Sequence, residues 1–153
     1  MDARLFFFYL FVSVVSSELV RKKICKGVET PTCSIHNVHV DPCPEGPAFC
    51  LIRRNKLYQV TVDFTPQFSS SNLKLSINGD SAKDASFSTA ILPPTSGCDV
   101  ITCPLQKDTR QSFNTTISLN KRSRGKFPIQ VKLWNEDNSA DVCCVTFNVR
   151  VLK

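Results

Sequence analysis

The sequence contains few of the residues that form catalytic or metal sites. Its 153 residues include five scattered glycines, which cannot form a glycine-rich phosphate-binding loop. The G-x-S-x-G motif of serine hydrolases and the C-x-x-C pairs of structural zinc sites are both absent. The two histidines, His36 and His39, flank Asn-Val in an expected strand, where a structural role is favoured over a metal pair. We therefore expect a protein that is not an enzyme, with no catalytic residue, no metal and no cofactor.

The chain also lacks a second long apolar run after its N-terminus. Residues 1–4 form a short charged lead, residues 5–15 are almost continuously apolar, and small residues precede Glu18. This pattern predicts a secretory signal peptide over residues 1–17. A run of about 18 apolar residues, which a transmembrane helix needs, does not follow. We expect a soluble, secreted, single domain over residues 18–153, located outside the cell or in the endosomal or lysosomal lumen.

Eight cysteines in a secreted chain predict a disulfide framework with no thiol left over. Cys43 and Cys50 bracket one short loop and Cys98 and Cys103 another, so each pair is expected to bridge locally. The remaining cysteines are Cys25 and Cys33 near the N-terminus and the adjacent Cys143 and Cys144 near the C-terminus. A bridge between the two ends would contribute about 4 to 5 kcal/mol by loop closure. Both pairings of these four remain open, as does a strained Cys143–Cys144 ring.

Apolar and polar residues alternate along most of the chain, as they do in half-buried β-strands. Strands are predicted at residues 34–40, 56–64, 72–78, 113–119, 127–134 and in the C-terminal segment that begins with the two cysteines. In that last strand Cys143 and Cys144 should point to opposite faces and bond to different partners. Turn-forming stretches separate the strands, among them "TPQFSSSN", "NGDSAKD", "LPPTSG" and "NEDNSAD".

Seven or eight short antiparallel strands at this spacing predict an all-β fold, a two-layer immunoglobulin-like antiparallel β-sandwich. Antibody-type domains join their sheets by a central disulfide beside a tryptophan. Here the expected bridges lie in loops and at the chain ends, and Trp134 lies next to a turn. The sheets could therefore stay apart and enclose an internal lipid cavity.

Four segments resemble the ML lipid-recognition family, and most closely its Niemann-Pick type C protein two group with the arthropod members related to group 2 dust-mite allergens. They are Val38–Phe68 with its Pro-Cys-Pro loop, Gly97–Phe113 with Cys-Pro-Leu-Gln-Lys, residues 127–134, and residues 144–151. The resemblance implies a secreted sandwich that holds a lipid between its sheets. That lipid is a sterol in the Niemann-Pick group and lipid A in the co-receptor of the Toll-like lipopolysaccharide receptor.

The resemblance also implies a disulfide pairing. It supports Cys43–Cys50 and Cys98–Cys103, and it pairs Cys25 with Cys144, which opens the last strand. Cys33 and Cys143 are additional to the commonest pattern of the family and would pair with each other. The swapped pairing, Cys25–Cys143 with Cys33–Cys144, is compatible with the sequence.

Several apolar residues match or continue the lipid-contacting positions of the family. Val40 matches a sterol-contacting valine, Phe127 and Pro128 match an aromatic-proline pair at the pocket mouth, and Ile129 follows on the same edge. One of Phe87, Ile91 and Leu92 would occupy the entrance, because the proline-rich run of the mammalian type is absent. The expected interior lining is Val60, Val62, Phe64, Leu75, Phe113, Ile117, Val131 and Phe147.

The loop before Phe127 is basic, where a strict sterol pocket would have a more apolar rim. Lys121, Arg122, Arg124 and Lys126 could contact the anionic head group of an amphiphile. A formal charge of +6 and a pI near 9.0 favour anionic membranes or ligands weakly. Asn114, in the sequon Asn-Thr-Thr, is a predicted glycosylation site.

The sequence therefore favours a monomeric secreted protein that carries a sterol or related lipid. An anionic lipid, a membrane surface or a lipid-accepting membrane protein are further expected partners, and nucleic acid is not, because aromatic residues are not interleaved on a basic face. Two alternatives remain open. One is an innate-immune recognition module for anionic bacterial lipids such as lipopolysaccharide, and the other is an immunoglobulin-like adhesion protein without lipid.

Overall fold

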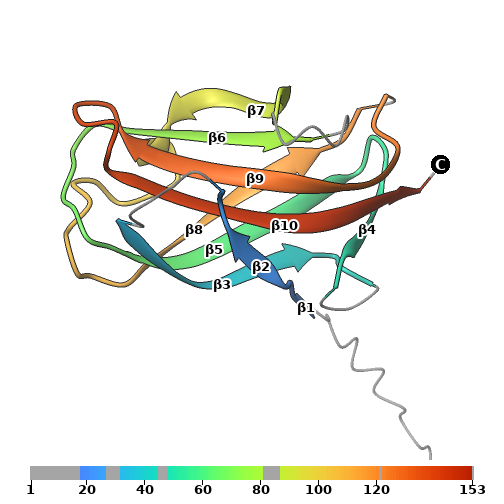
Figure 1. The fold of residues 1–153 in the computed structure, drawn as a ribbon, viewed down its shortest axis with the longest axis horizontal. Coiled ribbons are helices and arrows are strands. Elements are labelled where there is room, and N and C mark those ends of the chain that lie inside the picture. The colour runs from blue at the N-terminus through green and yellow to red at the C-terminus, as the bar shows by residue number, and fades with distance from the viewer. Residues whose placement is uncertain (1–17, 27–31, 45–47, 81–86, 121, 153) are drawn as a thin grey trace, which may run out of the picture.

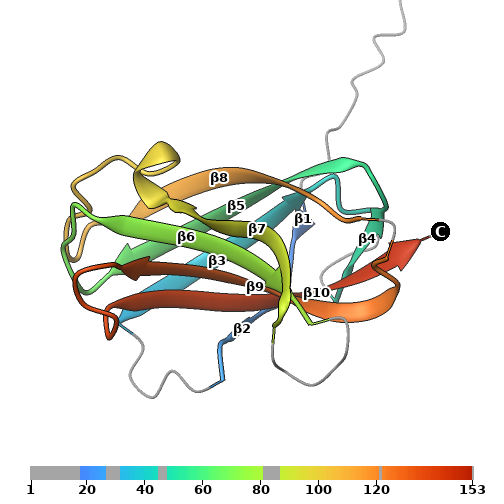
Figure 2. The same ribbon diagram turned by 90° about the horizontal axis from the view of Figure 1, so that it is seen from above.

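The computed structural model describes residues 18–26, 32–44, 48–80, 87–120 and 122–152, which form two β-sheets packed face to face. The predicted signal peptide, residues 1–17, lies outside the described residues. One sheet has four strands in the order β1 (Glu18–Leu19), β3 (Cys33–Asp41), β5 (Leu57–Pro66) and β8 (Gln111–Ser118). The other has six, β2 (Lys22–Ile24), β10 (Val142–Leu152), β9 (Gly125–Asn135), β6 (Leu73–Gly79) and β7 (Thr89–Ser96), with β4 (Cys50–Arg53) also beside β10. Figures 1 and 2 show the two layers, and the predicted immunoglobulin-like sandwich is confirmed.

The longest strands, β9 and β10, show why these residues form a sandwich. They are antiparallel neighbours in the six-stranded sheet, and their register places Val145 opposite Val131 and Phe147 opposite Ile129. These four side chains are buried, while the intervening Thr146 is only partly buried. Because side chains alternate across a strand, one face of each strand is apolar and covers the core.

The inner faces of the two sheets form one hydrophobic cluster. Phe64 of β5 and Phe113 of β8 pack edge to face in the four-stranded sheet, with ring centroids 5.9 Å apart. Leu75, Ile77 and Leu133 fill the facing side of the six-stranded sheet and are almost completely buried. Among the described residues no helix is long and apolar enough to span a membrane.

The N-terminal segment passes from one sheet to the other. Glu18 and Leu19 of β1 pair with β3, and after the buried Val20 the chain continues as β2 beside β10. Further along the same edge of β10, β4 pairs with residues Val149–Leu152 in parallel. This β4–β10 pair is the one parallel pairing among the described strands of the otherwise antiparallel sandwich.

The stretch "LPPTSG", predicted as a turn, is instead mostly part of a strand. Residues Leu92 to Ser96 belong to β7, which pairs with β6 on one side only. Proline lacks the backbone N–H, so it is tolerated on an edge strand, where one side of the ladder needs no donor. The register between β6 and β7 is irregular around Ile77, which accommodates Pro93 and Pro94.

The four disulfides join the same pairs that the family resemblance implies, and no described cysteine is free. Cys143 points into the core and bonds to Cys33 of β3. This bridge connects the two sheets, in contrast to the expectation that the bridges would lie only in loops and at chain ends. It sits at the first residue of β3 and the second of β10, so it joins the sheets at one end and not across their middle.

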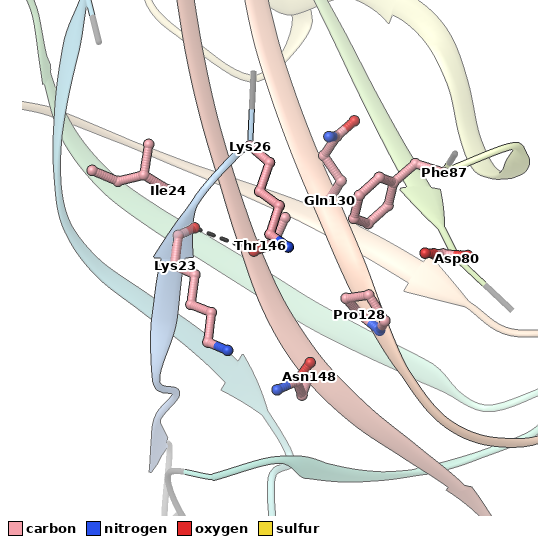
Figure 3. A pocket seen from close by; sticks show the side chains of 9 residues that line it. All are labelled: Lys23, Ile24, Lys26, Asp80, Phe87, Pro128, Gln130, Thr146 and Asn148. Atoms are coloured by element: carbon pink, nitrogen blue, oxygen red, sulfur yellow. Dashed lines mark hydrogen bonds between the residues drawn. The ribbon is translucent and has the colours of Figure 1, made fainter. Parts of the chain in front are cut away.

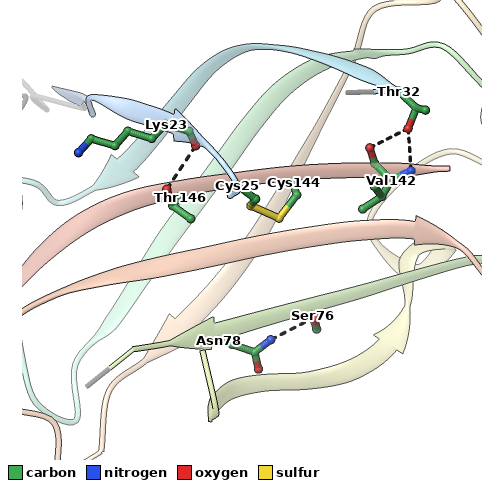
Figure 4. The surroundings of a disulfide bond; sticks show 8 residues. All are labelled: Lys23, Cys25, Thr32, Ser76, Asn78, Val142, Cys144 and Thr146. Carbon is green, nitrogen blue, oxygen red and sulfur yellow. Dashed lines mark hydrogen bonds between the residues drawn. A yellow bond between two sulfur atoms is a disulfide. The ribbon is translucent and has the colours of Figure 1, made fainter. Parts of the chain in front are cut away.

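Cys144 points the opposite way and bonds to Cys25, on the outer face of the six-stranded sheet (Figure 4). Trp134 and Val142 pack against this bridge, so the tryptophan and disulfide of this sandwich meet outside the core. Nearby, the Thr32 hydroxyl donates to the Val142 carbonyl oxygen at 2.9 Å and accepts from the Val142 N–H at 2.7 Å.

The two long bridges are expected to stabilise the fold in a coupled way. Their sequence separations are 119 and 110 residues, but either bridge alone already ties the chain ends together. With one bridge intact, the other closes only a short ring through residues 25–33, worth about 2 to 3 kcal/mol in the loop-closure model. Removing both should cost about 7 kcal/mol, more than the sum of the two single losses.

Urea unfolding of Cys25→Ala/Cys144→Ala, of Cys33→Ala/Cys143→Ala and of the variant lacking all four cysteines measures this coupling. Cys98→Ala/Cys103→Ala, which opens an independent loop, is the control. Its loss of unfolding free energy should add to the loss caused by removing either long bridge. Additive losses for the two long bridges would contradict the prediction.

Candidate functional site

The end of the sandwich that holds the C-terminus (right in Figure 1) contains the ends of the strands that carry Val40, Phe127 and Ile129. Here β3 ends at Asp41, β6 ends at Gly79 and β9 begins at Gly125. Val40 lies on the inner face of the four-stranded sheet, and Phe127 and Ile129 lie on the inner face of the six-stranded sheet. The Cys43–Cys50 bridge ties the segment after β3 to the start of β4 at this end.

Gly79 makes room for the aromatic ring at this end. A Cβ atom at this position would lie 3.1 Å from Cε2 of Phe127 and 3.3 Å from Cδ1 of Ile91. Any larger residue would therefore push against both side chains. Gly79 also pairs with Ile129 in the β6–β9 register. The side chains of Phe127 and Ile91 and the strand partner Ile129 therefore all lie next to Gly79.

Most of the predicted lining residues are buried in the core between the sheets. Ile91 is partly buried and packs against this cluster from β7. The fully or nearly fully buried ones are Val40, Val60, Val62, Phe64, Leu75, Phe113, Ile117, Phe127, Ile129, Val131 and Phe147.

Two predicted contact residues lie elsewhere. Pro128 follows Phe127 in β9 and so faces the opposite side of the sheet, where it lines a hollow on the outer face. Phe87 lines the same hollow. The aromatic-proline pair is thus divided between the two faces of β9, because adjacent strand residues point in opposite directions.

The basic loop connects the two sheets at the same end. Arg122, Arg124 and Lys126 are exposed, while Lys121 lies outside the described residues. The Arg122 N–H donates to Oδ1 of Asn120 at 2.9 Å, which shapes the turn, and the positive φ of Gly125 (74°) leads into β9. Lys126 Nζ lies 4.3 Å from the ring centroid of Phe49, within cation–π range.

Lys126 is also directly opposite Arg150 in the β9–β10 ladder. Both side chains are exposed on the outer face of the six-stranded sheet. Like charges placed opposite each other destabilise a sheet slightly, so this pair favours an anionic neighbour.

The hollows that were not predicted from the sequence include two that are lined by residues of β2. One, of about 270 Å³, lies on the outer face of the six-stranded sheet between β2 and the ends of β6 and β9. The other, of about 330 Å³, lies at the edge between the sheets, where Ile24 and Val145 face Cys33 and Ile35 of β3. The basic stretch "KKICK" around Cys25 is the sequence feature that could have pointed to these hollows. The hollows form only because this stretch pairs with β10, and that pairing cannot be read from the local sequence.

Lys22 spans the edge hollow, since its Nζ donates to the carbonyl oxygen of His36. The imidazole ring of His36 also has a hydrogen-bond partner, because its Nε2 atom lies 2.8 Å from Oγ1 of Thr65. Among the described residues, no three His, Cys, Asp or Glu side chains gather as a metal site would require.

The predicted glycosylation residue, Asn114, is exposed on β8 and alternates with the buried Phe113 and Thr115. Its orientation toward solvent is what attachment of a glycan requires. The modification itself stays a prediction.

Comparison with known proteins places this geometry in a family. The model of the ML domain matches residues 20–151. An MD-2-related lipid-recognition protein of Manduca sexta is 24% identical over 130 residues, covering 84% of this chain and 83% of that protein.

Two solved structures share the fold. A Niemann-Pick type C2 protein from the Japanese carpenter ant aligns with a TM-score of 0.57 and 17% identity, over 90% of this chain and 99% of that one. Chicken MD-1, solved in complex with lipid IVa, aligns with a TM-score of 0.52 and 14% identity, over 87% of this chain and 95% of that one. The family model, which spans nearly all of the described sandwich, shows that this chain belongs to the ML domain family of lipid-recognition proteins.

Proposed function

We propose that this protein is a secreted, monomeric carrier that holds a sterol or a similar apolar lipid between its two sheets. Membership of the ML domain family is the observation that carries the proposal. The placement of Val40, Phe127 and Ile129 on facing inner surfaces at one end of the sandwich supports it. The four disulfides and the predicted signal peptide support secretion.

The lipid would enter at the C-terminal end, between Val40 on one sheet and Phe127 and Ile91 on the other. This end is free of the Cys33–Cys143 bridge, which holds the sheets together at the opposite end. Separation of the layers by side-chain movement is therefore easiest here. Delivery of the lipid would involve a membrane surface or a lipid-accepting membrane protein.

Burial of apolar surface is large enough to drive such binding. A sterol would bury on the order of 400 Å² of apolar surface, which corresponds to roughly 10 kcal/mol before the costs of association. This gross gain exceeds the roughly 8 kcal/mol to which micromolar binding corresponds. Selectivity among lipids would come from the shape of the site and from the few polar groups at its entrance.

Ile129→Phe is expected to weaken binding of a fluorescent sterol by about tenfold or more, because the added ring would occupy space at the proposed site. Leu133→Phe is the matched control, since Leu133 lies on the same strand and face, is equally buried, and is nearer the Cys33–Cys143 end. Both substitutions should cost about 1 to 3 kcal/mol of stability through overpacking.

Sterol titration at a temperature where both variants are folded separates the two effects. Equal binding by the two variants would contradict the proposed position of the lipid. Failure of the wild-type protein to bind any sterol or to retain lipid after purification would contradict the carrier function and favour the adhesion alternative.

A second candidate function is recognition of an anionic lipid, as in an innate-immune module. The observation that favours it is the exposed basic loop, Arg122, Arg124 and Lys126, at the same end as the proposed entrance. The structure of chicken MD-1 with lipid IVa is that of a fold relative bound to a phosphorylated glycolipid. In this chain the loop cations would contact the phosphates while acyl chains enter between the sheets.

Replacing Arg122, Arg124 and Lys126 by glutamine is expected to weaken binding of lipid IVa by about tenfold or more, because charge-assisted hydrogen bonds to phosphate are lost. Binding of an uncharged sterol to the same variant should be unchanged and serves as the control. If the affinity for both lipids is retained, the basic loop is not part of a lipid site.

A further inference from the structure

The outer face of the six-stranded sheet carries a hollow of about 270 Å³ that the proposed lipid carrier function does not use. Figure 3 shows its lining, which comes from β2, the end of β6, β9, β10 and the segment before β7. Polar residues outnumber apolar ones in this lining, while apolar atoms contribute the larger part of its surface. The lining residues are Lys23, Ile24, Lys26, Asp80, Phe87, Pro128, Gln130, Thr146 and Asn148.

The strand register builds the floor of this hollow. Lys23 of β2, Thr146 of β10 and Gln130 of β9 are successive partners across the sheet, so their side chains project from one row. Asn148 and Pro128 are paired in the next row. Hydroxyl and amide groups therefore stand side by side on rigid strands, between cationic and apolar side chains.

The backbone that carries both lysines is held against β10 by a disulfide and by backbone pairing. Lys23 and Lys26 flank the Cys25–Cys144 bridge, which fixes β2 against β10. The Thr146 hydroxyl donates to the Lys23 carbonyl oxygen at 3.3 Å (Figures 3 and 4). Among the described residues no carboxylate forms an ion pair with either ammonium group, and both side chains are exposed.

The remaining charges near the hollow are also mostly positive. Another hollow, whose lining includes Phe49 and Lys126, adjoins this one and shares Pro128 and Asn148 with it. Arg150 stands opposite Lys126 in the ladder. The carboxylate residue of the lining, Asp80, is only 4% exposed, and in Figure 3 it lies beside Phe87 and Pro128, away from Lys23.

We propose that this outer-face hollow binds a phosphate ester. Lys23 and Lys26 would pair with the phosphate oxygens, and the side-chain amides of Gln130 and Asn148 would donate hydrogen bonds to them. Ile24, Phe87 and Pro128 would contact the apolar part of the ester. The site lies on the opposite face of β9 and β10 from the core, so it is distinct from the proposed lipid site between the sheets and does not depend on it.

Phosphate esters occur as lipid head groups and as free metabolites, and two probes distinguish these sources. Glycerol 3-phosphate is titrated into the folded protein while the backbone amide resonances are followed by NMR. Phosphatidylcholine vesicles, with and without phosphatidic acid, are tested by co-sedimentation. We expect shifts centred on Gln130, Thr146 and Asn148, or preferential binding to the vesicles that contain phosphatidic acid, or both.

Lys23→Gln/Lys26→Gln is expected to weaken this binding by about tenfold or more, because two charge-assisted contacts are lost. Lys56→Gln/Lys107→Gln removes the same charge at two exposed lysines outside the hollow and should leave binding within about twofold of wild type. Sterol binding by both variants should be unchanged, which separates this proposal from the carrier function.

The pattern of loss identifies the source of the ligand. A loss with both probes supports a site for phosphate esters in general, and a loss with vesicles alone supports a lipid head group. The proposal is overturned if wild type binds neither probe, or if the Lys23/Lys26 variant binds as tightly as the Lys56/Lys107 control.

Discussion

The pairing of β9 with β10 is the constraint on which the rest of the structure depends. Its register places Val145 and Phe147 beside Val131 and Ile129, and this row of apolar side chains forms the floor of the core. The same register sends every intervening residue to the outer face. A slip by one residue would expose the apolar row and bury Thr146 and its neighbours, so the hydrophobic effect holds the pairing in place.

The two adjacent cysteines use this alternation to join three parts of the chain. Cys143 faces inward and reaches β3 of the opposite sheet, while Cys144 faces outward and reaches the end of β2. One strand end is thereby bonded to both the facing layer and the neighbouring strand. The sandwich is clamped at this end, and its C-terminal end carries the residues proposed to admit a lipid.

Because β9 and β10 have two dissimilar faces, they can serve two kinds of ligand. Phe127 and Ile129 face the core, where apolar burial is the available driving force, and Pro128 and Gln130 face the outer hollow, where lysines and amides favour an oxyanion. The cationic Lys126 and Arg150 lie on the outer face between the basic loop and the hollow.

The sequence by itself determined the strands whose side chains alternate, such as 56–64, 113–119 and 127–134, and the opposite orientations of Cys143 and Cys144, because period-two patterning is a local property of the chain. Only the tertiary structure decided that Pro93 and Pro94 lie in an edge strand, that β4 runs parallel to β10, and that Phe87 and Pro128 face outward with Lys23 and Lys26. Each of these features depends on which strand lies next to which, and that is set by packing between segments far apart in the sequence. Local patterning shows which residues share a face, but not which neighbour or ligand that face meets.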